Sequence, residues 1–211
     1  MLESSAPKLT FILLLGSYDL DTKTLLDLLK RKIAEKYGGE GVFAFLLDEL
    51  EIYSTKEYFA LVERWTEERI SVHTFHRDGT LKESYDLEIT KEKIIDEAIK
   101  GLLRKELDVK EVTKLPVLEK LELIMKISKE ILVIRDREET RGGEIAELIY
   151  CIMSGLSEKV CFFKKEGFML SSMLMEFLDK QRVVIRTYRN HNDLVDSVLR
   201  FLSYRLSQNQ T

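Results

Sequence analysis

The sequence predicts an α/β protein with a doubly wound, mostly parallel sheet, a β-hairpin on one side and a helical insert. Short runs dominated by apolar residues alternate along the chain with segments of helical periodicity, which is the order of elements in such folds. Apolar runs of this length are typical of strands buried on both faces of a parallel sheet. The predicted strands are Leu9–Leu15, Val42–Leu47, Ile131–Ile134, Lys159–Phe163 and Val183–Tyr188.

Helices are predicted after most of these strands. In the first helix, Leu25, Leu29 and Ile33 recur every four residues and form an apolar stripe. Asp21 suits the N-cap of this helix, and Gly38-Gly39 suits its end. The later helices are predicted over Glu144–Met153, over Met169–Leu178 and from His191-Asn192-Asp193 onward.

The segment between the second and third of these strands carries other local signals. Ser54 and Glu57 have the spacing of a capping box, which predicts a helix to about Glu68. Asp78-Gly79 lies between two runs of alternating apolar and polar residues, which predicts a β-hairpin. One face of this hairpin is expected to be exposed to solvent, as at a sheet edge. The two arms of this hairpin are Ile70–His76 and Leu81–Ile89.

A helical insert is expected at about residues 91–126. Thr90 can cap a helix over Lys91–Leu107, and Pro116 suits the first turn of a second helix. No Pro/Gly-rich linker divides the chain. We therefore expect a single α/β domain over residues 9–207, after a flexible lead-in at residues 1–8.

The composition is that of a soluble globular protein. Of the 211 residues, 45% are hydrophobic and 33% are charged, which is enough for a core and a soluble surface. The run Phe11–Leu15 is too short for a signal peptide, and no run approaches the roughly 20 apolar residues of a membrane span. Cys151 and Cys161 make no disulfide framework, so we expect a cytoplasmic protein without a membrane partner.

The net charge and the missing motifs argue against nucleic-acid, metal and cofactor binding. The formal net charge of -4 argues against a nucleic-acid partner, because phosphate backbones need a concentrated basic surface. We interpret the basic stretches Lys164–Lys165 and Arg182–Arg189 as solvated faces. The histidines and cysteines lack metal-ligand spacing, and neither a G-x-G-x-x-G fingerprint nor a Walker A sequence occurs. We therefore expect no metal and no cofactor.

The densest group of candidate catalytic residues follows the strand Ile131–Ile134. Gly142 and Gly143 allow a ligand to approach the backbone, and a helix starting there offers free N–H groups. Glu144 and Glu147 lie on one face of the first helical turns and could act as nucleophile and base. In the structural alternative, these carboxylates only stabilise the helix dipole.

Polar residues also follow other predicted strands. Those after the first strand are Gly16, Ser17, Tyr18 and Asp19. The glycine allows a tight turn there, and the Ser and Asp side chains could bind ligand hydroxyls or only form a turn and an N-cap. Asp48 and Asp136 each end a strand, where carboxylates often bind ribose hydroxyls in nucleotide folds. They could equally be solvated loop ends.

The segment Gly143-Glu144-Ile145-Ala146-Glu147-Leu148 resembles the helix opening of nucleoside 2-deoxyribosyltransferases and of the related TIR-like NAD-cleaving domains. The transferase pattern is Gly-Thr-x-x-Glu-Leu-Gly-x-Ala, after a strand that ends near acidic residues. Gly143, Glu147 and Leu148 match it, while Glu144 occupies the Thr position. The first strand with Gly16-Ser17-Tyr18 also looks like the opening strand and loop of this family. The resemblance implies a flavodoxin-like or TIR-like three-layer fold.

The resemblance also implies roles for individual residues. Glu147 would be the nucleophile or key carboxylate at an N-glycosidic bond, Asp136 would approach the ribose, and residues 16–19 would line the pocket. The first hypothesis is therefore an enzyme that binds a nucleoside or nucleotide and cleaves or transfers its N-glycosidic bond. The alternative is a non-catalytic module that senses a nucleotide. We also expect a homodimer, because one sheet does not fully cover the apolar helices.

Overall fold

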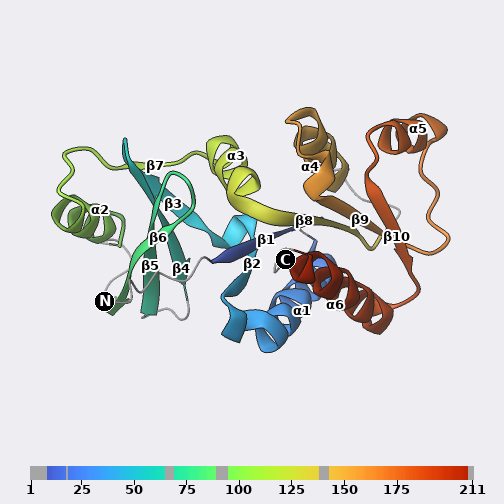
Figure 1. The fold of residues 1–211 in the computed structure, drawn as a ribbon, viewed down its shortest axis with the longest axis horizontal. Coiled ribbons are helices and arrows are strands. Elements are labelled where there is room, and N and C mark those ends of the chain that lie inside the picture. Colours follow the sequence, from blue (N-terminus) through green and yellow to red (C-terminus); the bar gives the residue numbers. More distant parts are fainter. Residues whose placement is uncertain (1–8, 18, 65–68, 89–94, 138–142, 209–211) are drawn as a thin grey trace. The chain divides into compact units, whose positions relative to one another are not determined.

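The computed structural model describes residues 9–17, 19–64, 69–88, 95–137 and 143–208 (Figure 1). They form an α/β protein with a five-stranded parallel sheet, a separate five-stranded antiparallel sheet and six α-helices. The sequence was expected to form one domain, whereas the chain groups into two compact units. The first is Thr10–Leu46 with the chain from Ser128 onward, and the second contains Leu47–Ile127. The expected lead-in at residues 1–8 lies outside the described residues.

The parallel sheet belongs to the first unit. Its strands are β1 (Thr10–Gly16), β2 (Val42–Leu46), β8 (Ser128–Arg135), β9 (Val160–Lys165) and β10 (Val184–Tyr188). They lie in the order β10-β9-β8-β1-β2, and every neighbouring pair is parallel. The five predicted strands are thereby confirmed. The order of the strands reverses between β1 and β8, which sends the chain to opposite halves of the sheet.

Helices cover both faces of this sheet. They are α1 (Leu20–Tyr37), α4 (Gly143–Met153), α5 (Ser172–Lys180) and α6 (His191–Ser207). Figure 1 shows α1 and α6 on one face and α4 and α5 on the other. Alternate strand residues therefore enter different cores: Leu132 and Ile134 pack with α1 and α6, while Ile131 and Val133 point to the opposite face. The interior strands are buried on both faces, which explains their continuous apolar sequence.

The turn from β1 into α1 depends on a close approach of backbone and side chains. Asp19 is the N-cap of α1, because its carboxylate accepts hydrogen bonds from the backbone and the hydroxyl of Thr22. The N-cap assigned to Asp21 was wrong, since that residue lies inside the first turn of the helix. A Cβ on Gly16 would lie 3.1 Å from the carbonyl oxygen of Ile134 and 3.2 Å from Leu26 Cδ1. The helix can begin this close to β8 because residue 16 has no side chain.

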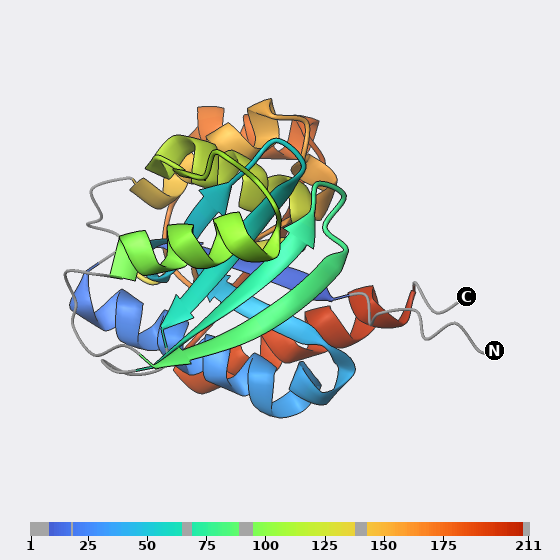
Figure 2. The same cartoon turned by 90° about the vertical axis from the view of Figure 1, so that its left-hand side faces the viewer.

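The antiparallel sheet belongs to the second unit. Its strands are β3 (Glu51–Ser54), β4 (Tyr58–Arg64), β5 (Arg69–His76), β6 (Leu81–Glu88) and β7 (Thr113–Lys114), in the order β6-β5-β4-β3-β7. Helix α2 (Ile95–Glu106) lies across one face, as Figure 2 shows. There Ile99 and Leu103 pack against Tyr53 and Val72. Helix α3 (Val117–Ile127) ends the unit.

The helix predicted from Ser54 to about Glu68 was wrong. Thr55 and Tyr58 instead form a hairpin turn between β3 and β4, in which Tyr58 N donates to Thr55 Oγ1 at 3.0 Å. The capping-box spacing is therefore used for a turn. In β4, Phe59 and Ala60 are both buried although they point to opposite faces of the sheet. Aromatic and branched residues that can be buried on both faces favour a strand over an exposed helix.

The hairpin of β5 and β6 is confirmed, but its place in the fold differs from the expected one. It belongs to the separate antiparallel sheet, where β6 is the edge strand, and it does not extend the parallel sheet. At its turn Gly79 has a φ of 88°, which explains the glycine. The expected insert at about 91–126 contains α2 and α3, with β7 between them. Residues 89–94, including the proposed cap Thr90, lie outside the described residues.

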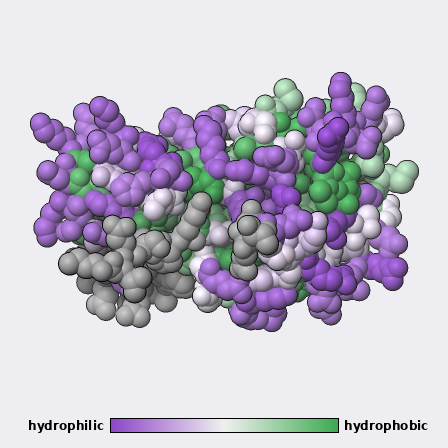
Figure 3. Space-filling view, in the orientation of Figure 1, coloured by the Kyte–Doolittle hydropathy of each residue, from purple (hydrophilic) through white to green (hydrophobic). Residues whose placement is uncertain are grey.

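Exposed apolar side chains gather on the part of the first unit formed by α4, α5 and β10. Figure 3 shows green and pale green atoms over α4 and α5, between purple hydrophilic ones. These residues are Ile149, Met153, Met169, Met173, Met175 and Val184. Met169 and Met173 are 81% and 79% exposed, so these two methionines lie outside the core.

We expect Gly16→Ala to lower the free energy of unfolding by about 1–3 kcal/mol, because the new methyl group overpacks the contact with Ile134 and Leu26. Chemical denaturation measures the change. Gly39→Ala is the matched control in the same unit, since nothing lies within 4 Å of a Cβ there, and it should shift stability by less than about 0.5 kcal/mol. Equal effects of the two substitutions would contradict the packing argument.

Candidate functional site

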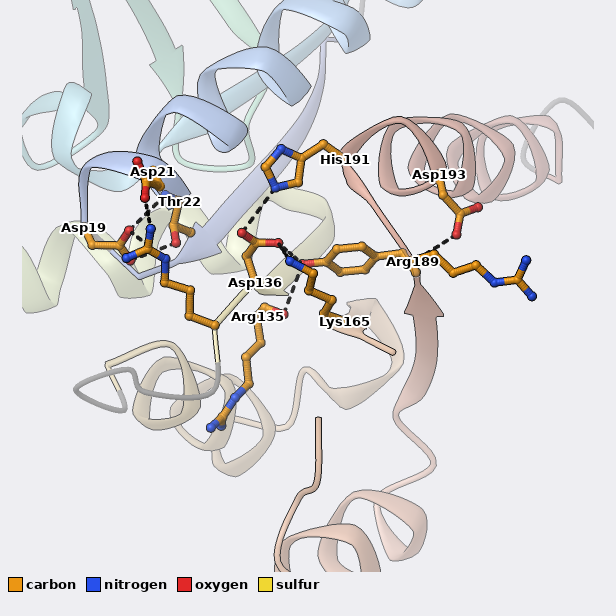
Figure 4. A network of polar contacts seen from close by, with 11 residues as sticks. Asp19, Asp21, Thr22, Arg135, Asp136, Lys165, Arg189, His191 and Asp193 are labelled. Atoms are coloured by element: carbon orange, nitrogen blue, oxygen red, sulfur yellow. Dashed lines mark hydrogen bonds and ion pairs between the residues drawn. The ribbon is translucent and has the colours of Figure 1, made fainter. Parts of the chain in front are cut away.

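The candidate site lies at the carboxyl edge of the parallel sheet, where the strand order reverses between β1 and β8. Open α/β sheets bind ligands in the crevice at such a point. Polar side chains from five segments meet there within the first unit (Figure 4). They include Asp19 after β1, Asp136 and Arg137 after β8, Lys165 at the end of β9, Tyr188 at the end of β10 and His191 at the start of α6.

Asp136 is the centre of this group, and its side chain is only 6% exposed. Tyr188 donates its hydroxyl to Asp136 Oδ1 at 2.9 Å, and Lys165 Nζ lies 3.8 Å from the same oxygen. His191 Nε2 lies 3.3 Å from Asp136 Oδ2. Figure 4 shows the carboxylate between His191 and Lys165. A buried carboxylate is thus compensated by groups from three other elements.

The register of the sheet explains why these residues meet. Arg135 pairs with Lys164, so the next residues, Asp136 and Lys165, lie side by side; Lys165 in turn pairs with Tyr188. These three residues form one row across the end of the sheet, on the face covered by α1 and α6. Asn190 caps α6 by accepting from Asp193 N at 3.0 Å, and His191 is the first residue of that helix. The cap therefore fixes His191 above the row.

Tyr188 is a fixed donor to Asp136. Burial, followed by the negative charge of Asp136 and their hydrogen bond, raises the pKa of Tyr188 well above its usual value. The phenol therefore stays protonated over the whole physiological range. It also donates to the carbonyl oxygen of Arg135 at 3.1 Å, which ties the end of β10 to the end of β8.

Asp19 lies at the other side of the switch point. Burial opposes the ionisation of Asp19, but hydrogen bonds from Thr22 and Ser17 and the charge of Arg137 outweigh it, so the pKa is lowered. Arg137 Nε lies 3.8 Å from Asp19 Oδ1, and the same guanidinium pairs with Asp21. Arg137 thus joins the loop after β8 to the beginning of α1.

The residue before Asp136 points to the opposite face of the sheet. Arg135 NH1 lies 3.9 Å from Glu144 Oε1 in the first turn of α4, and the Glu144 side chain is 1% exposed. Glu144 and Asp136 are thus held on opposite faces by different partners. This contact favours a structural role for Glu144, which fixes α4 to the end of β8.

Glu147 is half-buried on α4, beside the stripe that faces the sheet. Burial, with a smaller contribution from the charge of Glu147, raises the pKa of Cys151 to about 12. Cys151 is therefore an inert core thiol, as expected. Gly143 opens α4, is exposed, and has nothing within 4 Å of its Cβ position. The backbone at the start of this helix is therefore accessible to a ligand.

The remaining sequence-predicted residues are placed as follows. Ser17 is half-buried and hydrogen-bonds Asp19. Asp48 lies in a short 3₁₀ helix (Leu47–Glu49) in the second unit, where its charge acts on Lys120. Tyr18 and Gly142 lie outside the described residues.

Sequence reasoning missed Lys165, Tyr188 and His191 as members of the site. Each follows an apolar run or opens a helix, which marks the carboxyl end of a strand. From the sequence, Lys165 is interpreted as part of a solvated basic stretch, and His191 as the start of the last helix without metal-ligand spacing. Their convergence on Asp136 depends on the strand order, which no local pattern gives.

The described residues contain neither a metal-binding group nor a membrane-spanning helix. No group of three or more His, Cys, Asp or Glu side chains there could hold a metal ion. No helix in the described part of the chain is long and apolar enough to cross a membrane. Comparison with models of protein families and with curated protein sequences gives no match.

We expect Tyr188→Phe to lower the free energy of unfolding by about 1.5–3 kcal/mol, because the buried Asp136 carboxylate loses a short hydrogen bond. Urea denaturation at neutral pH measures this loss. Tyr204→Phe removes the hydroxyl from a ring that is largely exposed, and should change stability by less than about 0.5 kcal/mol. A Tyr188 effect as small as that of Tyr204 would show that the hydrogen bond is unimportant.

Proposed function

We propose that this protein binds a nucleoside or nucleotide at the carboxyl edge of its parallel sheet and cleaves or transfers the N-glycosidic bond. The observation that carries the proposal is the buried Asp136 carboxylate at the switch point, fixed by Tyr188, Lys165 and His191. Burial of a charge at a strand end is costly, and a buried carboxylate with specific charged partners at such a place is typical of a functional site. The strand order, equivalent to 2-1-3-4-5 within this unit, supports a flavodoxin-like arrangement, in which ligands bind at this point.

The groups at the site suit the parts of such a ligand. Carboxylate oxygens of Asp19, whose side chain is about a third exposed, can accept hydrogen bonds from ribose hydroxyls. Arg137 and Lys165 are about half and a third exposed, so their charges can also meet a phosphate where the ligand carries one. The first turn of α4, opened by Gly143, offers backbone N–H groups.

Glu147 is the proposed carboxylate for the chemical step. It lies on α4 one turn beyond Gly143, where the transferases that this segment resembles carry their key glutamate. Its carboxylate would add to C1′ of the ribose as the bond to the base breaks, and water or a second base would then release the sugar. Glu144 lies against Arg135 in the first turn of the helix, and the resemblance assigns the chemical step to Glu147.

A non-catalytic nucleotide-sensing module is the second candidate. It is favoured by the contacts of Asp19 and Glu144, which serve the fold. Both carboxylate oxygens of Asp19 accept hydrogen bonds from Thr22, and Glu144 lies against Arg135. Such a site would bind the ligand and leave the glycosidic bond intact.

The test is incubation of the purified protein with NAD, nucleosides and nucleoside monophosphates, with released base measured by chromatography and melting temperature measured in parallel. A bound ligand at a hundred times its Kd should stabilise the fold by about 2.7 kcal/mol. We expect Glu147→Gln to abolish base release while the ligand still raises the melting temperature.

Glu176→Gln is the control, because Glu176 is exposed on α5, and it should keep the parent rate. Ligand binding without base release by the parent would establish the sensor. Neither binding nor release with any compound would overturn the proposed function.

We also propose that the protein is a homodimer through the exposed apolar residues of α4 and α5, because apolar side chains gathered on one part of a surface are typical of interfaces. Met173→Glu should shift the mass measured by light scattering from dimer to monomer. Tyr204→Ser changes another exposed apolar residue, on α6, and should leave the dimer intact. A monomeric parent protein would refute this proposal.

A further inference from the structure

We infer that His191 protonates the leaving base during the cleavage, and that Asp136 is the residue that positions it for this step. The inference rests on the proposed N-glycosidic cleavage and adds a residue that the resemblance does not supply. It follows from three features: the contact of His191 with a buried carboxylate, the exposure of its ring, and the faces of the sheet on which His191 and Glu147 lie.

The first feature is the pairing of the ring with Asp136. His191 Nε2 lies 3.3 Å from Oδ2, while Tyr188 and Lys165 hold the other oxygen. A carboxylate on one ring nitrogen fixes the tautomer and orientation of a histidine. The other nitrogen, Nδ1, is then the one that can exchange a proton with a ligand.

The second feature is access. Asp136 is buried, whereas the side chain of His191 is 49% exposed. The pair therefore reaches from the interior to the surface at the switch point. A general acid needs this combination, because its ring must be held on one side and must reach the ligand on the other. A histidine that served only to compensate the buried charge would not need half of its surface exposed.

The third feature is the opposition of the two helices. His191 begins α6 and Glu147 lies on α4, and these helices cover opposite faces of the sheet (Figure 1). Displacement at C1′ requires the entering carboxylate and the leaving base on opposite sides of that carbon. A ribose above the end of β8 would have Glu147 on one side and His191 on the other. Two groups from the same helix could not provide this geometry.

The reaction balances with these groups and one water. As the bond between C1′ and the base nitrogen breaks, its electron pair goes to the base, which takes the proton from Nδ1 of His191. The Glu147 carboxylate forms a bond to C1′. Neutral His191 then takes a proton from water, the resulting hydroxide replaces Glu147 at C1′, and the enzyme returns to its first state. The net change is hydrolysis to free base and ribose.

The test compares substrates whose leaving groups differ in their need for a proton. Inosine loses an anionic purine unless the purine is protonated, whereas N7-methylated inosine and NAD carry cationic bases that leave neutral without a proton. We expect His191→Gln to lower kcat/KM for inosine by about 10²–10⁴-fold and to change it by less than about tenfold for the two cationic substrates. Asp136→Asn should give the same selective loss, because it acts through His191.

His76→Gln is the matched control, since His76 is exposed in the second unit, and should leave all three rates unchanged. Melting temperatures of the variants show whether each is folded. Two results would overturn the role of His191: equal losses of kcat/KM on all three substrates in both folded variants, or no loss on inosine. In either case, base release by the parent protein would still support the proposed cleavage. A parent that releases only the cationic bases would also overturn the role of His191. A parent that releases no base from any substrate would overturn the proposed cleavage itself.

Discussion

Burial of the Asp136 carboxylate at the end of β8 places a negative charge where water cannot solvate it. Such a charge is tolerated only when protein groups replace the lost water. Here the phenol of Tyr188, the ammonium of Lys165 and the ring of His191 do so, and they come from β10, β9 and α6. The carboxylate therefore fixes the ends of three elements relative to β8. Loss of any one of these three partners would leave the buried charge of Asp136 less well compensated.

The two-residue period of a strand then divides the edge of the sheet into two sides. Asp136 points to the layer of α1 and α6, and the preceding Arg135 points to the layer of α4, where it meets Glu144. One strand end thus anchors a helix on each face. Because both anchors lie at the switch point, α4 and α6 start on either side of the place where a ligand would enter. The polar contacts that stabilise the edge are the same contacts that shape the site.

Much of the parallel sheet could be predicted from the sequence, because strands buried on both faces need continuous apolar residues. The hairpin was predictable too, since Asp-Gly at residues 78 and 79 has a local conformational cause. The prediction of a helix over residues 54–68 was wrong because Ser54 and Glu57 have the spacing of a helix cap. Burial of Phe59 and Ala60 on opposite faces of a sheet favours a strand there instead. Pairing of β3 with β4 and with β7 is a long-range choice that no window of sequence contains.

The same limit explains the candidate site. Asp19 and Asp136 could be located because each follows a recognisable strand. Lys165 and Tyr188 could be assigned to them only through the register that sets Arg135 beside Lys164 and Lys165 beside Tyr188.

The register also restricts the place of a ligand. Asp136 follows β8, the strand between β1 and β9, so a ligand beside the pair of Asp136 and His191 would lie between the loop after β1 and the start of α6. Asp19 and Arg137 are then on one side of that molecule and His191 is on the other. A ligand with hydroxyl groups at one end and a basic ring at the other would satisfy both sides at once, which is the chemical form of a nucleoside.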